Sequence, residues 1–304
     1  MTYVQGAEKN NCLLPADFRR MAIAAVCAAV FGVTGLAAEV KNGGFEQTYV
    51  RDPNAPEIAA LRKVGWKLQS PLVWPEEWEG TPTASNVDFA TVKDSPHAGT
   101  NCILLWGQAG SSGYLSQEVQ GLKKGIYKLS FWGKGNPQAK ATLILGNVHI
   151  VLNAHMTGQW TEYSGIYRNI AAQEADLTLQ GQKGEVFFDD VSIVECDVLE
   201  AALVEESLTM RKEGKWLAPG AKPDAKVFQK NVREVARVIP ELKTYVEADP
   251  IPANVKLIRL LEARAAQLEK IAAAPTVAQA NEAAACARLA QRLVIELQFE
   301  DVEK

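Results

Sequence analysis

The pattern of hydrophobic and polar positions divides the chain into two parts with different textures. Between about residues 40 and 195, short apolar runs with period-2 alternation are separated by clusters of Gly, Asn and Pro. The clearest runs are KLSFW, ATLILG, HIVLN, WTEYSGIY, ADLTLQG and EVFFDDVSIVE. Short strands at regular spacing, with no helical period between them, are typical of a β-sandwich.

The second part begins near residue 198, where Ala, Leu, Glu, Lys and Arg dominate and the apolar residues recur with helical spacing. Asp224 and Thr276 are expected N-caps. The predicted helices span about residues 198–212, 224–247, 253–273 and 276–299. The fold class predicted from the pattern is therefore a β-sandwich followed by a C-terminal α-helical bundle.

The N-terminal segment has the order of a secretory signal. Arg19 and Arg20 precede an apolar run that starts at Met21, and small residues follow at Ala37 and Ala38. A polar stretch of about twenty residues ahead of the arginines is atypical of such signals. An uncleaved anchor, and a true start at Met21, are the open alternatives.

These patterns predict three segments. Residues 1–38 are expected to be a signal peptide with a polar extension, residues 39–196 a sandwich, and residues 197–304 a helical domain. The protein would then be secreted, periplasmic or on the cell surface, with no stable membrane span after cleavage. The helical domain either packs on itself and the sandwich or offers a surface for a protein partner or for self-association.

Charge and cysteine content exclude several function classes. The net charge is -4 and no segment carries a dominant basic patch, so nucleic acid is not expected as a partner. Outside the predicted signal the cysteines are Cys102, Cys196 and Cys286, which show no CxxC spacing. Neither a zinc site nor a disulfide scaffold is indicated, and a single bridge stays open.

Two adjacent acids interrupt the apolar run of residues 185–195. In a regular strand Asp189 shares a face with Phe187 and Val191, so we expect Asp189 to point toward the core. A buried carboxylate needs a cation, a set of backbone N–H groups or a buried base as its partner.

Five sequence blocks occur in an order that resembles a known family. They are VKNGGFEQ, SPHAGTNCILLW, YLSQEVQGLKKGIYKLSFWGKG, GQWTEYSGIY and FFDDVSIV. Together they resemble the galactose-binding-like jelly roll of carbohydrate-binding modules of families 4, 9 and 22. The resemblance covers about half of the chain and leaves the helical tail unrecognised. It implies a jelly-roll sandwich that presents a carbohydrate-binding face.

The resemblance also implies a structural calcium ion. In such modules the Glu of the NGGFE block and the Asp of the DDV block hold the ion, and these positions are Glu46 and Asp189 here. Asp190 is a second candidate, and the loop that starts at Asp94 would add carbonyl oxygens. Oxygen-only ligation suits Ca²⁺. The alternative is that backbone N–H groups and basic side chains satisfy the acids without metal.

Sugar binding requires flat apolar ring faces and hydrogen-bonding side chains around them. Two tryptophans in a long loop are expected to be exposed, a third lies on the polar face of its strand, and Trp160 is expected to pack in the core. The candidate ligand-binding residues are Trp74, Trp78, Trp132, Tyr114 and Gln117.

Catalysis finds no support in the motifs. The three histidines stand in no HExxH or triad-like setting, and no GxSxG motif or phosphate loop is present. The predicted function is an exported, non-catalytic protein that binds poly- or oligosaccharide. The alternatives are a cell-surface structural or interaction protein that uses the same sandwich without sugar, and an accessory part of a polysaccharide-degrading enzyme.

Overall fold

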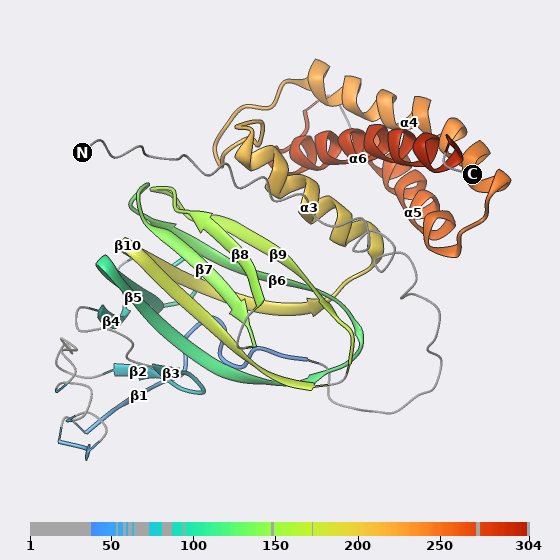
Figure 1. The fold of residues 1–304 in the computed structure, drawn as a ribbon. Coiled ribbons are helices and arrows are strands. Elements are labelled where there is room, and N and C mark those ends of the chain that lie inside the picture. Colours follow the sequence, from blue (N-terminus) through green and yellow to red (C-terminus); the bar gives the residue numbers. More distant parts are fainter. Residues whose placement is uncertain are drawn as a thin grey trace, which may run out of the picture.

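The structure is a computed structural model. It describes residues 38–52, 54–56, 59, 63, 73–80, 87–93, 95–146, 149–171, 173–271 and 274–302. All but the last residue of the predicted signal segment therefore lies outside the described residues. Strands make up the first part of the described chain, and helices make up the second part (Figure 1).

The strands are antiparallel and form a sandwich, with a small separate pair, β1 and β2, beside it. The strands are β1 (Thr48–Val50), β2 (Val73–Pro75), β3 (Glu79–Gly80), β4 (Val87–Val92), β5 (Cys102–Leu122), β6 (Gly125–Gly135), β7 (Lys140–Leu145), β8 (His149–His155), β9 (Thr161–Asn169) and β10 (Gln173–Glu195).

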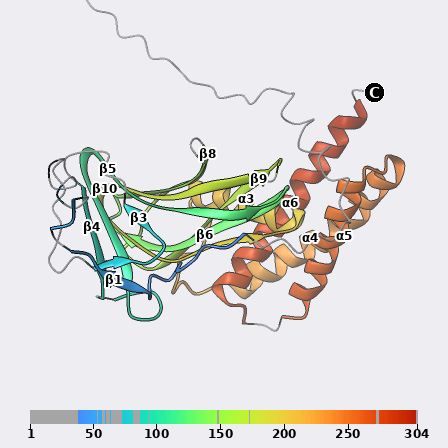
Figure 2. The same ribbon diagram turned by 90° about the horizontal axis from the view of Figure 1, so that it is seen from below.

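The long strands β5 and β10 run through both layers of the sandwich (Figures 1 and 2). The second half of β10 pairs with β6 and its first half with β7, and its register against β5 shifts between Gln182 and Gly184. One layer, here called the β6 layer, has the order β9–β6–β10–β5–β4. The other, the β7 layer, has the order β8–β7–β10–β5–β3.

Alternating apolar side chains from both layers fill the space between them. The residues between these apolar positions point to the outer faces, as the period-2 pattern predicts. Core residues of the β6 layer include Leu129, Phe131, Val186 and Phe188, and those of the β7 layer include Ala141, Leu143, Leu145, Leu177 and Leu179. The predicted β-sandwich is confirmed.

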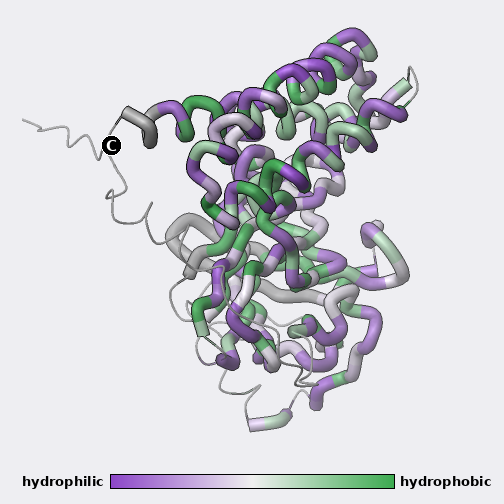
Figure 3. The backbone as a smooth tube through the Cα atoms, turned by 90° about the vertical axis from the view of Figure 1, so that its right-hand side faces the viewer, coloured by the Kyte–Doolittle hydropathy of each residue, from purple (hydrophilic) through white to green (hydrophobic). Residues whose placement is uncertain are grey.

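Four described helices follow: α3 (Val198–Lys212), α4 (Ala225–Ala248), α5 (Pro252–Glu269) and α6 (Val277–Val302). The predicted helical bundle is thereby confirmed. The Asp224 side chain accepts the first N–H groups of α4, and Thr276 and Gln279 exchange hydrogen bonds at the start of α6. Hydrophobic and hydrophilic positions alternate along these helices (Figure 3). Within the described part of the chain, none of the helices is both long and apolar enough to cross a membrane.

Helix α3 joins the sandwich to the bundle. It contacts β9 and β6 on one side and α5 and α6 on the other (Figure 1). Its Leu208 packs against the core of the sandwich, whereas Leu199 and Ala202 belong to the core of the bundle. A single helix therefore contributes to two hydrophobic cores.

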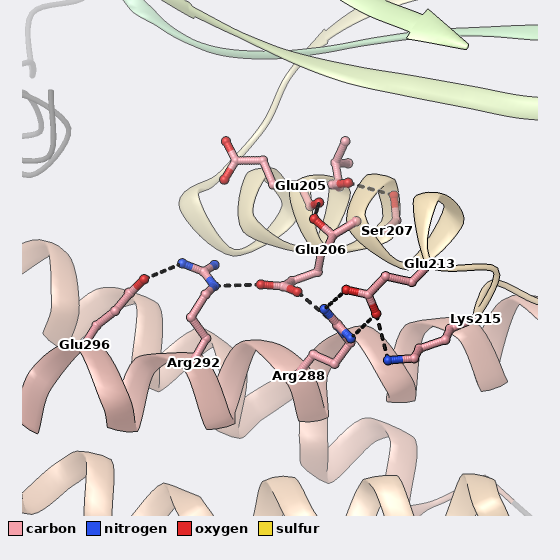
Figure 4. A network of polar contacts seen from close by, with 10 residues as sticks. Glu205, Glu206, Ser207, Glu213, Lys215, Arg288, Arg292 and Glu296 are labelled. Atoms are coloured by element: carbon pink, nitrogen blue, oxygen red, sulfur yellow. Dashed lines mark hydrogen bonds and ion pairs between the residues drawn. The ribbon is translucent and has the colours of Figure 1, made fainter. Parts of the chain in front are cut away.

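A buried glutamate strengthens this junction. Glu206 on α3 is only 6% exposed and bonds to two arginines of α6, Arg292 at 2.7 Å and Arg288 at 3.3 Å (Figure 4). Glu213 and Glu296 bind the outer sides of the same arginines. A buried carboxylate placed between two guanidinium groups is satisfied only while α3 and α6 stay in contact.

Replacing Glu206 tests this junction. In Glu206→Gln the side chain keeps its size but loses its charge, so we expect the free energy of unfolding to fall by about 1–3 kcal/mol. Urea unfolding followed by far-UV circular dichroism measures the change. The matched control is Glu296→Gln, a half-exposed pair within α6, for which we expect a change below about 0.5 kcal/mol. Equal effects of the two substitutions would contradict a special role for Glu206.

Candidate functional site

A row of polar side chains crosses the outer face of the β7 layer. Strand pairing places Asn153 on β8 opposite Thr142 on β7, Thr142 opposite Gln180 on β10, and Gln180 opposite Tyr114 on β5. Their chain neighbours, such as Leu143 and Leu179, belong to the core, so all four side chains point outward. We call Asn153, Thr142, Gln180 and Tyr114 the polar row.

The centre of the polar row is buried. Thr142 is 3% exposed and Gln180 is 7% exposed, although both lie on an outer face. Asn153 and Tyr114, at the two ends, are more accessible. Outward residues of a sheet are usually solvated, so the burial of these two side chains distinguishes the centre of the row from an ordinary sheet surface.

The buried polar groups are only partly satisfied. The Gln180 amide Nε2 donates a hydrogen bond to the Tyr114 hydroxyl at 2.8 Å. Among the described residues, the Gln180 carbonyl Oε1 and the Thr142 hydroxyl have no hydrogen-bond partner. Buried polar groups normally have a partner in the protein or in bound water. The Gln180 carbonyl is a neutral acceptor, and the Thr142 hydroxyl can both donate and accept a hydrogen bond. These two residues lie on neighbouring strands, and the Tyr114 ring lies on the strand next to Gln180.

Sequence reasoning named Tyr114 but missed Gln180, Thr142 and Asn153. The signal was present, because LTLQGQ alternates Leu177 and Leu179 with polar residues, which marks one polar face of a strand. What the sequence did not show is that strands far apart in the chain align their polar residues in one row.

The expectation that Trp74 and Trp78 are exposed in a loop is wrong. Each is 1% exposed and belongs to the sandwich core. The Trp74 indole donates to the carbonyl of Trp78 at 2.9 Å, and the Trp78 indole donates to the carbonyl of Asn42 at 3.2 Å. Trp74 lies on β2 and Trp78 lies between β2 and β3, and both rings pack in the core, where burial of an indole is strongly favourable. Neither ring is accessible for stacking on a sugar.

Gln117 also has a structural place. It shares the inward side of β5 with Leu115 and Val119 and is 6% exposed. Its amide accepts the backbone N–H of Lys41 and donates to the carbonyl of Lys41, both at 2.9 Å. Gln117 therefore holds the segment at the start of the sandwich in place. It does not belong to the polar row.

Trp132 lies half-buried on the outer face of the β6 layer, on the opposite side of the sandwich from the polar row. The His97 ring stacks on it, with centroids 3.7 Å apart, and His97 Nδ1 lies 2.6 Å from Asp190. Trp160, expected in the core, is half-buried and donates its indole N–H to the carbonyl of Ser95 at 3.0 Å. Both tryptophans thus hold the loop that begins at Ser95, and His97 occupies one face of the Trp132 ring.

The two adjacent acids sit at a β-bulge. The register of β10 against β6 shifts between Asp189 and Ser192, and Asp190 has φ of 46°. Phe188 faces the core before the bulge and Val191 faces it afterwards. The expectation that Asp189 points toward the core is therefore wrong, because the bulge changes which residues face inward.

Asp189 is nevertheless fully buried, because the loop from Ser95 covers it. Its carboxylate accepts backbone N–H groups from His97 at 2.8 Å, Ala98 at 3.2 Å and Asp190 at 2.8 Å. Burial raises the pKa of Asp189, and the three N–H donors oppose that shift. Both oxygens of this acid are thus engaged by backbone donors.

Glu46 is held in the same manner. It accepts the backbone N–H groups of Thr100 and Asn101 at 2.9 and 3.1 Å, and the Thr100 hydroxyl at 2.7 Å. The hydroxyl bond is the main reason that the pKa of Glu46 lies below its ordinary value. Gly99, with φ of 62°, lies against this carboxylate so closely that a Cβ atom there would collide with it.

The NGGFE block reaches the bulge directly. The carbonyl of Gly43 accepts the backbone N–H of Val191 at 2.9 Å, and a Cβ atom on Gly43 would strike the Val191 carbonyl. The blocks that contain Glu46 and Asp189 are thus brought together, as the family resemblance implies. They meet through backbone hydrogen bonds and the loop from Ser95.

These acids have protein partners in the structure. The carboxylate oxygens of Glu46 and Asp189 accept N–H and O–H groups, and Asp190 Oδ2 lies 2.6 Å from His97 Nδ1. The calcium ion stays a prediction. Within the described part of the chain, no group of three or more His, Cys, Asp or Glu side chains is arranged to hold a metal. The remaining predicted ligand, Asp94, lies outside the described residues.

Comparison with known proteins gives matches among solved structures only. No protein-family model and no curated protein matches the chain. The xylan-binding domain CBM22-1 of Paenibacillus barcinonensis Xyn10C is 15% identical, with a TM-score of 0.33, and the match covers 40% of this chain and 88% of that domain. TmCBM61, solved in complex with β-1,4-galactotriose, is 22% identical, with a TM-score of 0.33 and coverage of 52% and 97%. A solved CBM4 structure is 14% identical, with a TM-score of 0.32 and coverage of 51% and 99%.

Chelation tests the predicted calcium ion. Because N–H and O–H donors already satisfy Glu46 and Asp189, we expect the same thermal unfolding midpoint in EDTA and in millimolar calcium. An ion that binds only the folded state would raise the midpoint by mass action. The contrary result is a calcium-dependent rise of several degrees that disappears in Glu46→Gln, which would establish the metal site.

The lowered pKa of Glu46 predicts a pH dependence. A carboxyl whose pKa is lower in the folded state contributes stability above its unfolded pKa of about 4.3, and this contribution is lost as the pH falls through the folded value. In Thr100→Val the hydroxyl donor is absent, so the pKa of Glu46 rises and less stability is lost between pH 7 and pH 3. Urea unfolding at both pH values measures this.

The control for that experiment is Thr209→Val. The Thr209 hydroxyl donates to a backbone carbonyl of α3 and touches no carboxylate. Its pH dependence should equal that of the unsubstituted protein. The assignment fails if Thr100→Val also leaves the pH dependence unchanged.

Proposed function

We propose that the protein is a carbohydrate-binding protein that holds a poly- or oligosaccharide across the polar row, without catalysis. One observation carries this proposal: Gln180 and Thr142 are more than nine-tenths buried on an outer face, and their Oε1 and hydroxyl have no partner among the described residues. A ligand that supplies hydroxyl groups would satisfy both.

The shape of the row favours an extended ligand. Adjacent strands lie about 4.8 Å apart, so four side chains on neighbouring strands span about 14 Å. A sugar chain that crosses the strands would meet a different side chain at each strand. The Tyr114 ring at one end offers an apolar face of the kind on which sugar C–H groups pack.

The chemistry of the row favours binding over conversion. Its groups are two amides, a hydroxyl and a phenol, which are neutral hydrogen-bonding groups suited to sugar hydroxyls. Nothing in this row supplies the pair of carboxyl groups that glycoside hydrolysis usually needs. The proposal therefore assigns recognition to the sandwich and no bond cleavage.

The location is part of the proposal. Residues 1–38 contain two arginines, then an apolar run, then small residues, which is the order of an export signal. We therefore propose that the protein is secreted, periplasmic or at the cell surface. Polysaccharides are accessible to an exported protein in each of these places.

The test is binding of residues 39–304 to insoluble xylan, β-1,4-galactan and cellulose, followed by calorimetry with soluble oligosaccharides. In Gln180→Met the volume is kept but the amide is lost, so we expect affinity to fall at least about tenfold, as for loss of a buried hydrogen bond. Gln267→Met, on the exposed side of α5, is the matched control and should bind normally.

Two results would overturn the proposal. Unchanged affinity in a folded Gln180→Met protein would move the sugar site elsewhere. Absence of binding to every glycan tested, by a protein with a cooperative unfolding transition, would favour a structural or interaction role for the sandwich.

A further inference from the structure

Two basic residues lie beside the part of the polar row that Asn153 and Thr142 form. Lys140 on β7 pairs in register with His155 on β8, and Lys140 also lies opposite Gln182 on β10. Both are two residues along their strands from members of the row, Thr142 and Asn153, so their side chains share the outer face. The polar row is thus flanked by two basic side chains.

This pair is uncompensated within the described residues. Neither Lys140 nor His155 has an ion pair or a side-chain hydrogen bond there. Lys183, exposed at the adjacent bend of β10, adds a third basic group nearby. Two basic side chains opposite each other on neighbouring strands can both donate hydrogen bonds to one anion placed between them.

Acidic residues of this face lie at the opposite end. Glu118, Glu174 and Asp176 line a shallow open pocket of about 170 Å³. Asp176 precedes Gln182 by six residues on the same strand, which corresponds to about 20 Å. This separation exceeds the Debye length of about 8 Å at physiological salt, so the acids do not neutralise Lys140. The face therefore has a basic end and an acidic end.

We infer that the ligand is an acidic glycan, in which a uronic acid carboxylate binds beside Lys140 and His155 while neighbouring sugar hydroxyls bind the polar row. This inference rests on the proposed function and adds its substrate class. Lys140 donates to the carboxylate as a point charge. The acidic end disfavours a carboxylate there, so the carboxylate is expected at the basic residues.

Matched polymers test the inference in the protein that contains residues 39–304. Glucuronoxylan, polygalacturonate and alginate are each compared with their carboxyl-reduced derivatives, which keep the linkages but lack the charge. We expect at least one acidic polymer to bind about tenfold more tightly than its reduced partner. Added salt should weaken the acidic member of that pair more than the neutral one.

Variants assign the preference to the basic end. Lys140→Gln should weaken binding of the acidic polymer about tenfold more than binding of its reduced partner, so that the preference is lost. Lys256→Gln, an exposed lysine on α5, makes the same charge change in the helical bundle and should retain the preference. Gln180→Met should weaken both members of the pair equally.

The outcomes separate this inference from the proposed function. Equal binding of acidic and reduced polymers, with loss of both in Gln180→Met, overturns the inference and leaves the function standing. A preference for the acidic polymer that Lys140→Gln does not change places the carboxylate elsewhere and also overturns it. Binding of no member of any pair, acidic or neutral, overturns both.

Discussion

The pairing of β5 with β10 is the constraint on which the rest of the sandwich depends. These strands pair in both layers, and the other strands of the sandwich attach to one of them or to their neighbours. Every layer therefore takes its register from a single ladder. Because side chains alternate with period 2, a slip of this ladder by one residue would exchange core and surface positions in both layers.

That ladder places two different sites on opposite sides of the sandwich. The first half of β10 carries Gln180 and the polar row, and its second half carries Asp189 and the bulge. At the bulge, the carboxylates of Glu46 and Asp189 accept N–H groups from the loop that begins at Ser95. These contacts connect the start of the sandwich, that loop and β10, and they stabilise the fold. The partly satisfied groups of Gln180 and Thr142 lie on the other face.

The acids illustrate how burial and hydrogen bonding compete. Asp189 is completely buried and its pKa is raised, because desolvation outweighs three backbone donors. Glu46 is more exposed, and its pKa is lowered because the hydroxyl and N–H groups prevail. The helical bundle is attached in a comparable manner, since Glu206 is buried between the guanidinium groups of Arg288 and Arg292 where α3 meets α6. Polar groups thus specify the junctions, and the two apolar cores supply the driving force.

Local pattern determined much of this architecture. Period-2 runs gave strands, and helical spacing with the caps at Asp224 and Thr276 gave helices. The sequence also named Tyr114 as a candidate for sugar binding, which stays a prediction. Non-local contacts decided the rest. Trp74 and Trp78 were expected outside because a loop carries them, yet both pack in the core of the sandwich. The bulge at Asp190 reversed the facing of Asp189, and only the alignment of four strands brought Asn153, Thr142 and Gln180 beside Tyr114. Alternation is a property of neighbouring residues, so the sequence carries it directly, whereas burial and strand register depend on residues far apart in the chain and arise only when the chain folds.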